Sequence, residues 1–331
     1  MPHTGHETPC SLQKEFIFIP AASPIEPKLR TGQAEGLSNG VNSKMFKHIP
    51  IPSSFTLIKK RKVSLLVKEE YKNLLFQQRI EDFDVFLQRS RQSSNYLKGR
   101  TLHPSIPIRN GERMVLRQYV HGGLFRNFTR GLYLLGSRSF RELALTSEIR
   151  SCGIPTIQPI AAIHRFILPP LYQAYLISSE IRNSKDLIQY FQGIGPFTSR
   201  ENILLKRRTI RSAALLLQRF HQSGFYHGDL QLKNILVAGD QPLLIDFDRS
   251  YRKRTLSLRE RMKNLLRLNR SVEKQRLLGL PITRTDRWRF FLAYSGEDLA
   301  IRKAMEKVIR TYSIRHFLYR LGWTVQRVLG G

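Results

Sequence analysis

The sequence predicts an α+β fold in two lobes: a small N-terminal lobe built on a β-sheet with one key helix, and a larger, mostly helical C-terminal lobe. Three observations predict it. Strand-like runs separated by turn residues fill positions 96–120, an apolar stripe at helical spacing runs through 210–220, and two more short strands follow within 234–245. We expect residues 51–180 to form the small lobe with an N-terminal extension, and residues 181–331 to form the large lobe with basic C-terminal helices.

Composition and charge limit the classes of partner. The chain has 331 residues, 41% of them hydrophobic, enough for one large two-lobed domain or two small ones. Its 55 basic and 25 acidic residues give a formal charge of +30, which requires an anionic partner such as nucleic acid, acidic lipid or nucleotide. Cys10 and Cys152 show neither metal-ligand spacing nor a disulfide framework, which favours a reducing compartment. No run approaches eighteen apolar residues and no secretory signal pattern is present, so we expect neither a membrane span nor export.

The N-terminal part changes character near residue 50. Residues 1–50 carry scattered Pro, Gly, Ser and Asn with little periodicity, so we expect a disordered or loosely attached leader. An apolar segment at 55–67 contains four consecutive basic residues at 59–62, and a helix is predicted over 69–79.

Three strands are predicted next for the small lobe. Tyr96–Arg100 is typical of a strand running into a turn, Ser105–Ile108 of a second strand, and Arg113–Val120 of a third. Arg109–Gly111 supplies the turn between the last two. Together they indicate a three-stranded sheet.

A helix is expected over 139–149, where Glu142, Leu145 and Ile149 share one face. Two interpretations of Glu142 stay open. Its carboxylate could point inward and orient a cation that binds phosphate. Alternatively, Ser139 followed three residues later by Glu142 matches a capping box.

The large lobe is predicted around a helix and a hairpin. The helix ends near Gly224, which suits a C-terminal position where φ is positive. Asn234–Val237 and Pro242–Ile245 are predicted as two short strands joined by Gly239–Asp240, a turn of the hairpin type. The apolar stripe of the helix recurs at three- and four-residue intervals: Ile210, Ala213, Ala214, Leu217 and Phe220.

This hairpin carries the candidate chemistry. Asp229 lies on the loop that enters it, Asn234 follows five residues later, and Asp246 comes just after the second strand. A carboxylate at the first position can orient a hydroxyl, while amide and carboxylate oxygens at the other two can hold Mg²⁺ against a nucleoside triphosphate. We therefore expect Asp229 to be catalytic and Asn234 and Asp246 to bind metal. The alternative is that both aspartates are turn and cap residues.

Nucleotide contacts are predicted in the small lobe. In a lobe of this kind the first turn lies over the phosphates, and a basic residue on the third strand clamps the α- and β-phosphates. Gly99 and Arg100 occupy that turn, and Arg117 is the candidate clamp with Glu142 as its partner. Lysine is the usual clamp, but a guanidinium also grips two oxygens. The alternative is that Arg117 faces solvent from its strand.

A set of short motifs extends over roughly residues 95–275. It consists of Gly99–Arg100, Val115–Tyr119, Gly122–Leu124, Arg138–Glu142, Gly153–Thr156, His227–Leu230, Asn234–Leu236, Ile245–Arg249 and Asn264–Ser271. Together these motifs resemble the bacterial 3-deoxy-D-manno-octulosonic acid (Kdo) kinases of the lipopolysaccharide core kinase family, which have protein-kinase-like folds. The loop at 227–234 alone would also suit aminoglycoside phosphotransferases. The Arg-x-Tyr-x-x-Gly-Gly run and the closing Asp-Phe-Asp-Arg favour the resemblance to the Kdo kinases over the aminoglycoside phosphotransferases.

The resemblance implies a two-lobed protein-kinase-like fold that transfers the γ-phosphoryl group of ATP to the 4-hydroxyl of a Kdo residue on lipid A. It implies a catalytic role for Asp229, Mg²⁺ binding by Asn234 and Asp246, and ATP binding by Arg117 with Glu142.

Residues around Asp229 also differ from related sequences. Gln231 and Leu232 replace residue types common in relatives, which affects the expected acceptor contacts. Gly228 stands where many regulated protein kinases have an Arg that reads a phosphorylated activation loop, which argues against such a switch and against a protein substrate. His227 is expected to be structural.

The excess positive charge suggests where the protein acts. Residues 251–331 hold 20 basic and six acidic side chains, and anionic membrane surfaces attract such segments. We expect a peripheral protein on the cytoplasmic face of the inner membrane of a Gram-negative bacterium, with Kdo-lipid A or another lipopolysaccharide precursor as its partner. The sequence does not indicate an oligomeric state. An apolar stripe on a basic C-terminal helix suits either an interfacial anchor or packing on the large lobe: Ile314, Phe317, Leu318, Leu321, Val325 and Val328.

Two other functions remain open. A kinase of the same fold could act on another sugar or a soluble acceptor such as an aminoglycoside, although a charge of +30 suits a cationic acceptor poorly. A non-catalytic, nucleic-acid-binding protein on the same scaffold would use the basic surface instead. The retained Asp229, Asn234 and Asp246 argue against that, and no recognised nucleic-acid-binding motif occurs, so we expect no specific nucleic acid.

Overall fold

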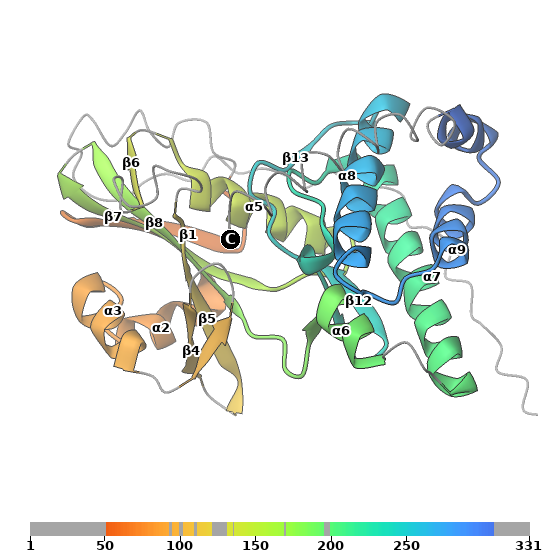
Figure 1. Ribbon diagram of the computed structural model, residues 1–331. Helices are drawn as coiled ribbons and strands as arrows, with labels where there is room; N and C mark the ends of the chain where they lie inside the picture. Colours follow the sequence, from red (N-terminus) through yellow and green to blue (C-terminus); the bar gives the residue numbers. More distant parts are fainter. Residues whose placement is uncertain are drawn as a thin grey trace, which may run out of the picture.

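A computed structural model of the chain describes residues 51–92, 95–98, 102–108, 111–120, 131–134, 136–168, 170–194 and 199–307. These residues form two lobes side by side, a β-sheet lobe on the left of Figure 1 and a helical lobe on the right. The segment between β8 (Leu171–Ser179) and β9 (Lys185–Asp186) connects them. The predicted limits at residues 50 and 180 stay predictions.

The small lobe is built on one antiparallel sheet. Its strands follow the order β1-β2-β7-β8-β5-β4-β3, and β6 pairs with the free end of β8. The predicted three strands form one edge of this sheet, which confirms them. The strands are β1 (Phe55–Lys59), β2 (Val63–Lys68), β3 (Tyr96–Lys98), β4 (Leu102–Pro107), β5 (Arg113–Gln118), β6 (Leu132–Leu134), β7 (Pro159–Leu168) and β8 (Leu171–Ser179).

Helices cover both faces of this sheet. α2 (Glu69–Gln77) and α3 (Phe83–Gln92) pack on one face, and α5 (Arg138–Ser151) packs on β7 and β8 from the other. Side chains alternate between the faces along each strand. On β5, Leu116 is buried with the α2 and α3 side chains, so the neighbouring Arg117 faces the α5 side.

The large lobe packs helices around a small hairpin. The helix α7 (Arg200–Gln222) runs through its centre, and its apolar face shares one core with the hairpin and with α8 and α9. The remaining elements are β9 (Lys185–Asp186), α6 (Leu187–Ile194), β10 (Phe225–Tyr226), the 3₁₀ helix η2 (Leu232–Asn234), β11 (Ile235–Ala238), β12 (Gln241–Leu244), β13 (Tyr251–Arg252), α8 (Leu258–Arg276) and α9 (Arg284–Ser295).

Most of the predicted elements are present. The helix predicted over 69–79 is α2, the helix predicted over 139–149 is α5, and the predicted hairpin is β11–β12 with Gly239 at φ +58°. The sequence interpretation missed that residues 55–67 form the β1–β2 hairpin. It also missed α3, whose buried face carries Phe83 and Phe86.

Candidate active site

The loop that carries Asp229 is held against the segment after β12. Gly224, which follows α7, has φ +83°, as predicted. At Gly228 a Cβ atom would lie 2.5 Å from the carbonyl oxygen of Asp248, so any side chain would collide with that backbone. Gly228 is therefore needed for close packing of two chain segments, which explains why no Arg stands before Asp229 here.

Asp229 accepts several hydrogen bonds through one carboxylate oxygen. Nε of Arg267 donates to Oδ1 at 3.0 Å, and Nη2 of the same guanidinium also donates to it. The amide of Gln231 donates to Oδ1 at 2.5 Å. Burial alone would raise the pKa of Asp229, but the bonds from Gln231 and Arg267 outweigh it and hold the pKa below its usual value. Asp229 is thus an oriented, ionised carboxylate.

A buried polar network supports this loop from behind. Nδ1 of His227 accepts the backbone N–H of Asp229 at 3.1 Å, and its Nε2 lies 3.0 Å from the carbonyl oxygen of Ile245. Burial lowers the pKa of His227, so the ring is neutral. Asn264 of α8 pairs with both backbone groups of His227, at 3.0 and 2.9 Å. The structure thus places His227 in the supporting role expected for it.

Asn234 and Asp246 lie at the same end of the hairpin. The backbone N–H of Ile245 donates to the carbonyl oxygen of Asn234 at 3.0 Å. The side-chain Nδ2 of Asn234 donates to the backbone oxygen of Asp229 at 2.7 Å, so its amide oxygen is the atom that could serve a cation. Asp246 has φ +65°, a left-handed conformation. The hairpin register therefore brings the two predicted ligands together.

This donor set suits Mg²⁺. Carboxylate and amide oxygens are hard ligands, and Mg²⁺ at nucleotide sites is usually bound by one or two carboxylates together with phosphates and water. Within the described part of the chain, no three His, Cys, Asp or Glu side chains cluster closely enough to hold a metal by themselves. A metal held by Asn234 and Asp246 would thus also need oxygens from a bound nucleotide.

Arg117 connects the small lobe to this end of the hairpin. Its Nη2 lies 2.6 Å from Oε2 of Glu142 on α5, and its Nη1 lies 3.0 Å from Oδ1 of Asp246. The Arg117 side chain is 24% exposed, and the Glu142 side chain is only 2% exposed. Arg117 therefore does not face solvent, and the structure contains the ion pair that was predicted between Arg117 and Glu142.

The capping-box interpretation of Glu142 is wrong. The helix α5 begins at Arg138 with Ser137 as its N-cap, so Ser139 and Glu142 both lie inside the helix. Burial raises the pKa of Glu142, while Arg117 and the hydroxyl of Tyr119, which donates to the carboxylate, oppose that shift. Glu142 therefore lies beyond the third helical position, which a capping box requires.

Several site residues were missed from the sequence. Tyr119, Arg138 and Asp248 belong to the quoted motifs but had no assigned role, and each contacts charged groups beside the site. His103 on β4 lies near Arg117 and Asp246. Burial lowers its pKa to about 4, with Arg117 acting in the same direction. The pairing of Arg267 with Asp229 joins positions 38 residues apart, which local spacing cannot reveal.

Other predicted features fall outside the described residues. These are the phosphate-covering turn at Gly99 and Arg100, the motif Gly122–Leu124, the leader at 1–50 and the C-terminal helix with its apolar stripe. Their roles stay predictions.

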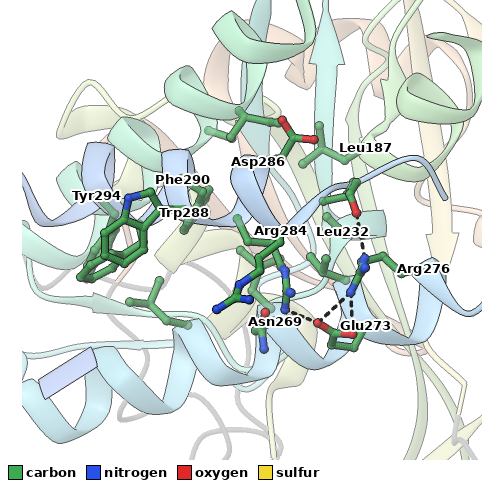
Figure 2. A pocket seen from close by; sticks show the side chains of 18 of the residues that line it. Leu187, Leu232, Asn269, Glu273, Arg276, Arg284, Asp286, Trp288, Phe290 and Tyr294 are labelled. Atoms are coloured by element: carbon green, nitrogen blue, oxygen red, sulfur yellow. Dashed lines mark hydrogen bonds and ion pairs between the residues drawn. The ribbon is translucent and has the colours of Figure 1, made fainter. Parts of the chain in front are cut away.

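A cavity of about 800 Å³ lies in the large lobe, between the loop that carries Asp229 and the helices α8 and α9. Figure 2 shows Leu232 of the loop facing it together with α8 and α9, whose Glu273 and Trp288 also line it. Its walls are mainly apolar side chains. None of the predicted site residues lines it, so the cavity lies behind the loop that carries Asp229.

The lobes and this site define a protein-kinase-like fold: a sheet lobe whose strand cation pairs with a helix carboxylate, and a helical lobe whose loop and hairpin carry Asp229, Asn234 and Asp246. Residues 80–294 match the lipopolysaccharide kinase (Kdo/WaaP) family, and the chain belongs to that family.

Individual relatives agree with this membership. The chain is 35% identical over 168 residues to the 3-deoxy-D-manno-octulosonic acid kinase of Xanthomonas axonopodis pv. citri (strain 306), covering 49% of this chain and 62% of the relative. It is 31% identical over 167 residues to the kinase of the same description from Vibrio vulnificus (strain YJ016), covering 49% and 66%. The matches thus span less than two thirds of these relatives. A solved structure, WaaP in complex with acyl carrier protein, is similar with a TM-score of 0.49 and 18% identity, covering 75% of this chain and 98% of that chain.

Proposed function

We propose that the protein transfers the γ-phosphoryl group of ATP to a Kdo residue, at its 4-hydroxyl, on Kdo-lipid A during lipopolysaccharide core biosynthesis. The observation that carries the proposal is the position of Arg117, which bridges Glu142 and Asp246 beside the loop of Asp229 and Asn234. The sugar acceptor is inferred from the family and from the names of the relatives.

The residues have distinct roles in this mechanism. Phosphoryl transfer demands mainly alignment and charge neutralisation, because the transition state is loose. The carboxylate of Asp229, held by Arg267 and Gln231, would accept a hydrogen bond from the sugar hydroxyl and take its proton late. A lowered pKa suits this role, since the alcohol becomes acidic only as the new bond forms.

The nucleotide would be held from both lobes. Arg117 presents a permanently charged fork that can bind phosphate oxygens, and Glu142 fixes its direction. Asn234 and Asp246 would hold Mg²⁺, which offsets negative charge on the phosphates when bound. Both lobes would thereby align the donor, and Asp229 of the large lobe would also align the acceptor.

The proposed location is the cytoplasmic face of the inner membrane of a Gram-negative bacterium, with peripheral attachment to its anionic surface. The charge of +30 supports this, because each Lys or Arg near such a surface contributes about 1 kcal/mol. Among the described residues, no helix is both long and apolar enough to cross a bilayer. Sedimentation with vesicles that contain phosphatidylglycerol, at low and high salt, tests the attachment.

The main experiment incubates purified protein with ATP, Mg²⁺ and Kdo-lipid A and follows the product by mass spectrometry. One added phosphate, located on the 4-position of Kdo by NMR, is the expected result. Lipid A without Kdo and kanamycin serve as control acceptors. Turnover of kanamycin with no reaction on Kdo-lipid A would replace the proposal with the soluble-acceptor function. Salt-sensitive retention on RNA without any ATP turnover would favour the nucleic-acid-binding function.

A further inference from the structure

The segment after β12 adopts a backbone that needs external support. Asp246 and Arg249 have φ values of +65° and +59°, a left-handed conformation that is unfavourable for a residue with a Cβ atom. Phe247, between them, is 1% exposed and stacks on Phe220 of α7, with ring centroids 6.0 Å apart. The large-lobe core thus anchors one side chain of this segment.

The small lobe anchors the next residue of this segment, Asp248. Arg138, the first residue of α5, donates from Nε to Oδ1 of Asp248 at 2.5 Å and from Nη2 to Oδ2. Its Nη1 donates to the hydroxyl of Tyr133 at 3.1 Å. A two-point fork of this kind fixes orientation as well as distance. The two side chains are 27% and 19% exposed and join positions 110 residues apart in different lobes.

Tyr119 connects this pair to the nucleotide clamp. Its ring lies 4.7 Å from the guanidinium carbon of Arg117 and 5.6 Å from that of Arg138. Its hydroxyl donates to Glu142, the partner of Arg117. One buried aromatic side chain thus contacts both cations, each of which binds an aspartate of the segment after β12.

We propose that Arg138 and Asp248 form a latch between the lobes that holds Asp246 in its metal-binding orientation. Both are positioning residues, since they act through Asp246 and not on the substrate. The inference deepens the proposed function and rests on it. The latch also connects α5 to the metal-binding segment without any modification of the chain. In regulated protein kinases a phosphorylated activation loop acts through an Arg at the position of Gly228, and here the backbone of Asp248 leaves no room for that side chain.

The competing explanation is that the pair only strengthens contact between the lobes. The chain offers a matched control for this. Glu148, also on α5, pairs with Arg252 of β13 at 2.6 Å, so it joins the same helix to the large lobe without touching the metal-binding segment. Arg252→Ala therefore removes an ion pair between the same helix and the large lobe that involves neither Asp246 nor Asp248.

The test measures affinity for the ATP analogue AMP-PNP by titration calorimetry, with Mg²⁺ and with EDTA, on full-length wild type, Arg138→Ala, Arg138→Lys, Asp248→Asn and Arg252→Ala. Residues that orient metal ligands typically contribute about 10–100-fold to metal affinity. We expect Arg138→Ala and Asp248→Asn to lose about tenfold in the Mg²⁺-dependent part of the affinity and to keep their affinity in EDTA. Arg138→Lys keeps the charge without the fork, so it should fall between them and wild type.

The outcomes distinguish failure of the latch from failure of the proposed function. Unchanged Mg²⁺-dependent affinity in Arg138→Ala, or an equal loss in Arg252→Ala, overturns the latch and leaves the proposed function intact. A wild type that binds no nucleotide with Mg²⁺ overturns the proposed function. If Arg138→Ala fails to fold, Arg138→Lys and Asp248→Asn give the same discrimination.

Discussion

The two lobes bring their site residues together by different means. In the large lobe, Asp229, Asn234 and Asp246 lie within one short stretch. The Asn234 side chain donates to the backbone of Asp229, and the hairpin backbone joins Asn234 to Ile245. In the small lobe, Arg117 and Glu142 come from a strand and a helix 25 residues apart and meet as a largely buried ion pair.

This difference predicts a division of labour. The loop with Asp229 and Asn234 is assembled by local structure and supported by Asn264 and His227, so it should persist when small-lobe charges change. The small-lobe half reaches the large lobe through Arg117–Asp246 and Arg138–Asp248. Changes there should affect nucleotide binding more than acceptor binding.

The largest expected effect comes from Asp229→Asn. Loss of the general base should lower kcat for phosphoryl transfer by roughly 10²–10⁴-fold, with nucleotide affinity nearly unchanged. The measurement is product formation by mass spectrometry beside AMP-PNP titration. Asp240→Asn, in the exposed hairpin turn, is the control and should behave as wild type. Equal turnover by Asp229→Asn would remove this residue from the mechanism.

The next effect tests the small lobe. Arg117→Ala removes charge-assisted hydrogen bonds and should raise the KM for ATP by about 10–100-fold, while the KM for the acceptor stays within about twofold. It also leaves the buried Glu142 without its cation, which costs about 3–5 kcal/mol of stability.

A double variant separates the two consequences of losing Arg117. Arg117→Ala combined with Glu142→Gln should regain stability in thermal unfolding and should not regain ATP affinity, because the uncompensated charge is gone but the clamp is still missing. An ATP affinity equal to wild type in Arg117→Ala would reassign the residue to a structural role.

A third prediction concerns how one buried histidine in each lobe makes the stability of the protein depend on pH. Burial lowers the pKa of His164 in the small lobe to about 3 and that of His221 in the large lobe to about 4. The folded state therefore favours neutral rings, and their contribution to the free energy of unfolding is fully present above the unfolded pKa of about 6.5. As pH falls from about 6.5 to about 4, the unfolded state binds protons that the folded state does not. Each ring should then lower the free energy of unfolding by about 1.4 kcal/mol per pH unit.

Denaturant unfolding at several pH values measures this slope. His164→Phe, whose ring would still stack between Phe140 and Tyr172, should reduce it by one proton equivalent. A slope identical to wild type between pH 6.5 and 4 would show that His164 is not neutral in the folded protein.

The smallest expected effect concerns the orientation of Asp229. Arg267→Gln removes a cation that lowers the pKa of Asp229, so the pKa should rise and the acid limb of kcat/KM should move to higher pH. The loss in kcat should be only about fivefold, corresponding to roughly 1 kcal/mol for a hydrogen bond. Lys274→Gln, on the exposed face of the same helix, should leave the profile in place. An unshifted acid limb in Arg267→Gln would contradict the assigned pairing.

The sequence predicted the structure correctly where the contacts that determine it are local. The hairpin was predicted because its turn chemistry and strand lengths are local features, and its register alone brings Asn234 beside Asp246. It failed over residues 55–67, where basic residues obscure the strand pattern and the pairing partner of β2 is β7, about 100 residues later. For Glu142, a local motif gave two equally good interpretations.

The sequence by itself determined the fold class, the hairpin β11–β12 and the candidate pair Arg117–Glu142, because periodicity, turn residues and short spacings are properties of the order of residues. Only the tertiary structure decided that Glu142 faces Arg117, that Arg267 holds Asp229, that Arg138 grips Asp248 and that Gly228 must be glycine. Each of these depends on side chains or backbone from distant elements approaching within a few ångströms, and such distances follow from packing and not from order along the chain.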